Sequence, residues 1–197
     1  MGIKIRNDTH HDIFVVVFTY IPMPHPSLVY RKTLLIPSGE RFNCPTWQSA
    51  VKIMAWEAPV HDCAISEEMR QNLSDQMAAV NVGRLLLVPI GGELLSMAST
   101  AADILIDGVM DSFIHDLLEL AIDEVIARLE NEMERGLAQE VRARQLAAAR
   151  LARESTRGVP MAKKTFFLTY NALFLRRQFS IHHNHADQLK INGAGMS

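Results

Sequence analysis

The chain has 197 residues, of which 48% are apolar and 21% are charged, and its net charge is −2 at neutral pH. This length and composition are those of one globular domain, or one domain with a large insertion, that buries its own core. The small negative charge argues against nucleic-acid binding through bulk electrostatics, and two cysteines are too few for a disulfide framework.

Two features predict a soluble, cytoplasmic protein. The N-terminal residues 1–6 carry Lys4 and Arg6 where a secretory signal needs an apolar core. The most apolar window, Ile104 to Leu129, is interrupted by six acidic residues. A spanning helix needs about 18–20 apolar residues in a row. Cys44 and Cys63 are expected to be free, buried thiols in a reducing compartment, with a single disulfide between them as the alternative.

Residues 1–60 are predicted to form five short strands, as in an antiparallel sandwich or meander. Residues 3–6 alternate apolar and charged side chains, which is the period of a half-buried strand. Residues 13–20 are β-branched or aromatic throughout, which is typical of a strand covered on both faces. The turn-forming residues between the two runs predict a hairpin. The other strands are expected over 29–36, 41–44 and 51–56, after an extended loop at Pro22, Pro24 and Pro26.

The opening of the chain resembles that of small β-sandwich proteins. The resemblance rests on the alternation Ile3-x-Ile5-x-Asn7-x-Thr9, a following strand, and the turn Pro37-Ser38-Gly39. Aegerolysins and actinoporins, which act on membranes, are among the sandwich proteins with such an opening. The resemblance implies a sandwich fold, and no functional residue is transferred from it.

A helix is predicted to begin at Ser66, whose side chain suits the N-cap position. Met69, Leu73 and Met77 then recur at helical spacing, and Gly83 ends the segment. Residues 85–92 are either a buried strand or an apolar linker, because a proline and two glycines close the run.

The run from Leu94 to Arg157 is the most unusual part of the chain. Between Leu118 and Leu137 the apolar residues share one helical face and the acidic residues share the opposite face. The apolar stripe upstream is rotated around the axis, so we expect a break near Gly108 to Ser112. One helix that meets different partners along its length is the alternative. After Gly136 alanines and arginines surround the axis, and no core face is expected.

Charge is distributed unevenly along this run. Residues 103–130 contain eight acidic residues and one arginine, a net charge of −7, whereas residues 131–157 contain six arginines and four glutamates, a net charge of +2. Acids near a helix start and bases near its end complement the helix dipole. The same asymmetry also favours pairing with an antiparallel copy or a partner helix. The Ala/Arg extension is therefore expected to meet another chain rather than fold back.

The C-terminal part returns to strand-forming residues. Strands are predicted over 166–170 and 173–181, with Asn171-Ala172 as a hairpin turn and residues 192–197 as a loose end. The expected fold is α+β: an antiparallel β-sandwich or sheet, built from N- and C-terminal segments, with a helical insertion. In one structural domain, residues 1–62 form the N-terminal β segment, 63–160 the insertion, and 161–197 the C-terminal β segment that rejoins the sheet.

The densest group of potential metal ligands is His182-His183-Asn184-His185. On a strand His183 and His185 share a face, and such pairs bind zinc or copper when other ligands converge on them. Cys44, His61 and Cys63 are the residues that would complete such a site, but surface histidines are the favoured interpretation. Ser38 and Cys44 lack the sequence context of a nucleophile, so no catalytic residue, metal ligand or cofactor is assigned.

The tail from Met161 contains five basic residues and one acidic residue, interleaved with aromatic residues. This composition suits contact with RNA, single-stranded DNA or an anionic membrane, but a solvated strand edge is favoured. Nucleic acid is accordingly an unlikely partner.

Taken together, these features favour a non-catalytic interaction or self-assembling structural protein, whose helical insert contacts another copy of the chain or a partner helix. One alternative is a membrane-active, pore-forming-like protein that inserts an amphipathic helix from residues 94–137. The other is a metal-dependent enzyme that uses the histidine-rich tail.

Overall fold

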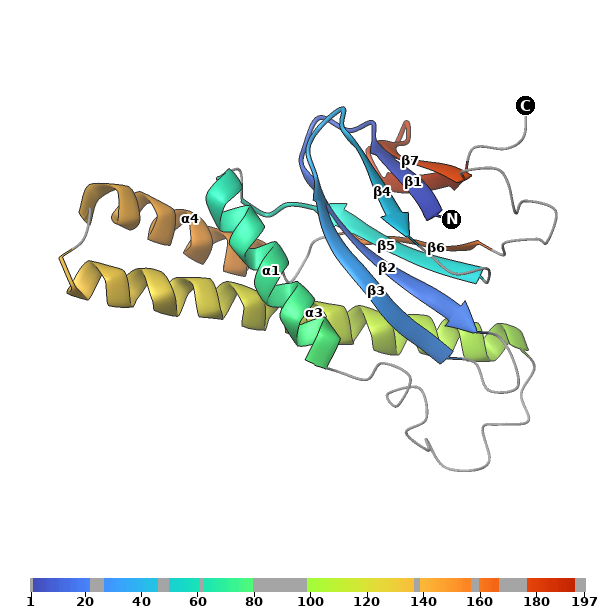
Figure 1. Ribbon diagram of the computed structural model, residues 1–197, viewed down its shortest axis with the longest axis horizontal. Coiled ribbons are helices and arrows are strands. Elements are labelled where there is room, and N and C mark those ends of the chain that lie inside the picture. Colours follow the sequence, from blue (N-terminus) through green and yellow to red (C-terminus); the bar gives the residue numbers. More distant parts are fainter. Residues whose placement is uncertain are drawn as a thin grey trace, which may run out of the picture.

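The computed structural model describes residues 2–21, 27–45, 50–60, 62–79, 99–136, 139–156, 160–166 and 177–193. In these residues it contains eight strands and three helices (Figure 1). The first five strands are β1 (Gly2–Asn7), β2 (Ile13–Ile21), β3 (Ser27–Ile36), β4 (Arg41–Pro45) and β5 (Ala50–Glu57). The helices are α1 (Cys63–Ala79), α3 (Ser99–Glu134) and α4 (Gln139–Thr156), and the last strands are β6 (Ala162–Phe166), β7 (Arg177–His183) and β8 (Leu189–Gly193).

The strands form two four-stranded sheets within the described residues. The outer sheet has the order β4-β1-β7-β8, and the central sheet has the order β3-β2-β5-β6. Each sheet combines N-terminal and C-terminal strands, so the predicted α+β fold with a helical insertion is confirmed. Pairing is antiparallel except between β1 and β7, which run parallel.

The molecule has three layers, with the central sheet between the outer sheet and the helices (Figure 1). Alternate side chains of β2 point toward the outer sheet and toward the helices. Ile13, Val15 and Val17 join the core against the outer sheet, while Phe14, Val16 and Phe18 join the core against the helices. All six are fully buried. This confirms that residues 13–20 form a strand covered on both faces, and it explains why charged residues are absent from the run.

The hairpin predicted from residues 3–6 and 13–20 is wrong, because β1 and β2 lie in different sheets. Asn7 stabilises the crossing between the sheets. Its buried side-chain amide donates to the carbonyls of His11 at 2.7 Å and Ile36 at 2.9 Å. Its Oδ1 accepts from the backbone N–H and the hydroxyl of Thr9, at 2.9 and 2.7 Å. The turn-forming residues between β1 and β2 therefore form the connection from the outer sheet to the central sheet.

The C-terminal strands also differ from the predicted hairpin. β6 pairs with β5 in the central sheet, whereas β7 pairs with β1 and β8 in the outer sheet, so β6 and β7 are not partners. The predicted turn at residues 171–172 lies outside the described residues. The predicted loose end is wrong at its start, because Asn192 and Gly193 belong to β8 and pair with Ser180 and Phe179.

Helix α1 begins at Cys63, and its cap lies four residues before the predicted cap at Ser66. Asp62 is its cap, because the Asp62 carboxylate accepts from the backbone N–H groups of Ala64 at 2.9 Å and Ile65 at 3.2 Å. The Ser66 hydroxyl instead donates to the Val60 carbonyl at 2.8 Å. The ambiguous segment 85–92 lies outside the described residues.

Helix α3 is continuous from Ser99 to Glu134, so the predicted break near Gly108 to Ser112 is wrong. One glycine inside a helix costs about 1 kcal/mol relative to alanine, which a packed helix tolerates. The turn lies instead after Glu134, where Gly136 has φ of 74°, a left-handed conformation that favours glycine. The chain then reverses into α4, and the two helices form a hairpin (Figure 1).

Candidate interaction surface

The α3–α4 hairpin extends beyond the edge of the sheets, as Figure 1 shows. α3 has 36 residues and is therefore about 54 Å long at 1.5 Å per residue. Its buried residues, among them Ile114, Leu118 and Ile122, join the core beneath the central sheet. The sheets thus support one end of the helix, and α4 packs along the other.

Helix α4 has a core face, contrary to the prediction that the Ala/Arg extension has none. Leu146, Ala149 and Ala152 are buried in the same core cluster as the apolar residues of α3. These three residues recur every three positions and so share one face. Two of them are alanines, which also occur all around this helix, and for this reason the apolar period was not visible in the sequence.

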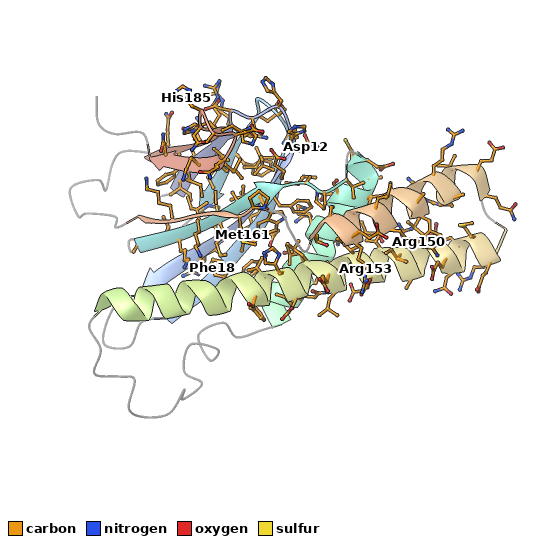
Figure 2. All side chains as sticks on the ribbon, turned by 180° about the vertical axis from the view of Figure 1, so that it is seen from behind. Asp12, Phe18, Arg150, Arg153, Met161 and His185 are labelled. Atoms are coloured by element: carbon orange, nitrogen blue, oxygen red, sulfur yellow. The ribbon has the colours of Figure 1, made fainter. Side chains whose placement is uncertain are left out.

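The facing sides of the hairpin are joined by ion pairs. Arg153 pairs with Asp123, and Arg150 Nη2 lies 2.6 Å from Glu130 Oε1. Arg142 Nε lies 2.7 Å from Glu132 Oε2, an ion pair without a straight hydrogen bond. Figure 2 shows Arg150 and Arg153 along the hairpin. The acidic and basic parts of the run therefore pair within one chain, and the expectation that the extension does not fold back is wrong.

Arg128 connects this hairpin to α1. Its guanidinium pairs with Glu68 of α1 and with Glu132 one helical turn onward. Hydrogen bonding to Glu68 raises the pKa of Arg128, with Glu132 adding to the effect. Because Glu132 also pairs with Arg142, ion pairs link all three helices. All four side chains are partly exposed, so each pair is worth about 0–1 kcal/mol and fixes geometry more than it adds stability.

Three of the four exposed large apolar residues in the described part of the chain lie on this hairpin. They are Leu120, Val141 and Leu151, and Leu151 is 68% exposed. Leu151 follows Ala143 and Ala147 at four-residue steps on the side of α4 that faces solvent. We call this surface the exposed face of α4; it consists of Glu140, Ala143, Arg144, Ala147, Leu151 and Glu154. This face is not recognisable in the sequence, because the Ala/Arg composition hides its four-residue repeat.

The histidines of the tail do not converge. His183 ends β7, and its Nε2 lies 2.8 Å from Glu57 Oε1 of β5. His182 lies on the opposite face of β7, with Nε2 3.4 Å from Asn192 Nδ2. His185 follows in a turn, so the prediction that it shares a strand face with His183 is wrong. Figure 2 shows it far from the hairpin. Among the described residues, no three His, Cys, Asp or Glu side chains are grouped to hold a metal ion.

The two thiols are both free, as expected, but their environments differ. Cys44 is buried between the sheets, and burial raises the pKa of its thiol, although the nearby Lys32 and Arg31 partly oppose the shift. Cys63 is exposed at the start of α1, so the prediction that both thiols are buried is wrong for this residue. His61 lies outside the described residues. The Ser38 hydroxyl donates to the Thr9 carbonyl at 2.6 Å and helps to hold its turn.

The basic residues of the tail are divided between the sheets. Lys163 and Lys164 lie on β6 at the edge of the central sheet, and Lys190 lies on β8 at the edge of the outer sheet. Arg176 is outside the described residues. The placed lysines therefore lie on the edge strands of the two sheets, β6 and β8, which contact each other.

Comparisons of the chain with models of protein families, with curated proteins and with solved structures found no match. Among the described residues, each helix is too short or too polar to cross a membrane. Function is therefore inferred from the geometry of this chain alone.

Proposed function

We propose that this protein is a non-catalytic structural protein that self-assembles through its helical hairpin. The observation that carries the proposal is the exposure of Leu151 on a helix whose opposite face is fully packed. The hairpin is already closed by its own core and ion pairs, so Leu151 is not needed to hold α4 in place.

The position of the hairpin supports this role. It projects past the sheets, so another molecule can reach it without displacing a strand (Figure 1). Burying a leucine side chain yields about 1.5–3 kcal/mol. The neighbouring Ala143 and Ala147 are small and exposed, which lets a second helix approach closely. An apolar residue beside small residues on a rigid helix is a suitable contact for another protein.

The test is the mass of the full chain in solution as a function of concentration. Self-assembly predicts a weight-average mass that rises above the monomer value of 22.1 kDa, measured by sedimentation velocity or light scattering. A mass that stays at the monomer value up to millimolar concentration would overturn the proposal.

A further inference from the structure

We propose that the exposed face of α4 pairs with the same face of a second copy, antiparallel, about a twofold axis between Ala147 and Leu151. This inference rests on the proposed self-assembly and identifies its interface. The partner is another molecule of this chain, and the contact is isologous, meaning that both copies use the same residues.

The apolar part of the exposed face fits this arrangement. In an antiparallel pair centred between positions 147 and 151, Leu151 of each copy faces Ala147 of the other. Leu151 is 68% exposed, and Ala147 is exposed as well. Each leucine thus meets a small residue, and the two helices can approach without a clash between bulky side chains.

The charges of the face select the same register. The axis that pairs positions 147 and 151 also brings Arg144 of each copy opposite Glu154 of the other, so two ion pairs flank the leucines. A parallel arrangement in register would instead place Arg144 against Arg144 and Glu154 against Glu154. Like charges in such positions disfavour a helix pair, and opposite charges determine its orientation.

Arg144 and Glu154 are available for this contact. Arg142, Arg150 and Arg153 are held by acids of α3. In the described part of the chain, Arg144 and Glu154 are exposed and have no intramolecular ion pair. Among the described residues, three charged residues of α4 have no ion pair with α3, namely Glu140, Arg144 and Glu154. Two of these, Arg144 and Glu154, complement each other across the axis.

The contact is small, and this sets its strength. One pair of helices of about five turns buries less surface than the roughly 1,200 Å² at which stable interfaces begin. We therefore expect reversible dimers at high micromolar concentration. Because the flanking pairs lie at the surface, added salt should weaken them.

Two charge reversals test the register directly. Arg144→Glu places acids at both position 144 and position 154, and Glu154→Arg places bases at both positions. Each variant alone should lose the concentration-dependent rise in mass in sedimentation velocity, because like charges oppose each other at both ends. An equimolar mixture should regain it, since opposite charges then meet at both ends. The double variant should associate like the wild-type protein.

The matched control is Arg135→Glu, the same reversal at an exposed arginine in the turn of the hairpin, which should leave association unchanged. Far-UV circular dichroism of every variant should match the wild-type spectrum. If the wild-type chain associates and both single variants associate equally well, this interface is wrong and self-assembly uses another surface. If the single variants dissociate and their mixture does not recover, the antiparallel register is wrong. A wild-type chain that stays monomeric overturns both proposals.

Discussion

Asn7 connects the two sheets through one side chain. It is fully buried and makes four hydrogen bonds, with the backbone of three other residues and the Thr9 hydroxyl. In the sequence it stands in a run of turn-forming residues, which predicts a corner correctly. That the corner joins two sheets depends on Ile36, 29 positions away, and no local pattern contains that information.

We expect Asn7→Ala to lower the free energy of unfolding by about 2–4 kcal/mol. The substitution leaves buried carbonyl and hydroxyl groups without partners, each at a cost of about 1–3 kcal/mol. The measurement is urea denaturation followed by circular dichroism. Asn43→Ala is the control, because Asn43 is exposed on β4, and its effect should stay within about 0.5 kcal/mol. Equal midpoints for the two variants would show that the Asn7 network is dispensable.

At the scale of elements, the chain gives different amounts of information about strands and helices. The five N-terminal strands are recognisable because alternation and β-branched runs are local signals. Strand pairing cannot be recognised from local signals, since β1 pairs with β4 and β7 rather than with β2, its neighbour in the sequence. The core face of α4 was missed because alanine is both a helix former and, at Ala149 and Ala152, the packed residue. A glycine occurs at the turn of the hairpin, Gly136, but another glycine, Gly108, lies inside a continuous helix. A glycine alone therefore does not identify the turn.

The candidate surface was harder still to predict. The charge asymmetry of the run was visible and predicted pairing with an antiparallel copy or a partner helix, whereas the acids of α3 pair with arginines of α4 in the same chain. Only once those arginines are paired do the remaining charges of α4 become distinct, and Arg144 and Glu154 are two of the three. Which charges remain free is a property of the folded hairpin and is not encoded in any short motif.

Packing of α4 against α3 can be tested at Ala149. We expect Ala149→Leu to lower the free energy of unfolding by about 1–3 kcal/mol, because the site is fully buried and extra methylenes strain a filled core. Ala127→Leu makes the same change at an exposed position of α3, where the effect should be within about 0.5 kcal/mol. Thermal and urea denaturation measure both. A stabilised Ala149→Leu chain would mean that the two helices are not closely packed.

At the scale of the whole molecule, the central sheet contributes side chains to both hydrophobic cores. The central sheet contributes Phe14 and Trp56, whose rings stack at 5.8 Å, to the same cluster as the three helices. Its other face forms the second cluster with the outer sheet. Loss of the helices would expose one complete face of the central sheet to water.

We therefore expect helices and sheets to unfold in a single transition. The Trp47→Phe variant leaves Trp56 as the sole tryptophan. Its fluorescence reports the central sheet, while circular dichroism at 222 nm reports mainly the helices. Coincident midpoints in urea are the expected result. If the helical signal is lost first, the insert is an independent folding unit.

The parallel pairing of β1 with β7 has a consequence for synthesis. β1 is made first, but β7 begins at Arg177, so the ribosome must add 170 more residues after Asn7 to reach even the first residue of β7. At about 5–20 residues per second this delay is about 10–30 s. Meanwhile Ile3 and Ile5 of β1, and the face of β2 that they will cover, remain accessible to water and to other chains. During that interval the core between the two sheets of the nascent protein is exposed. In a chain truncated before Arg177 it stays exposed permanently, because β7 is missing.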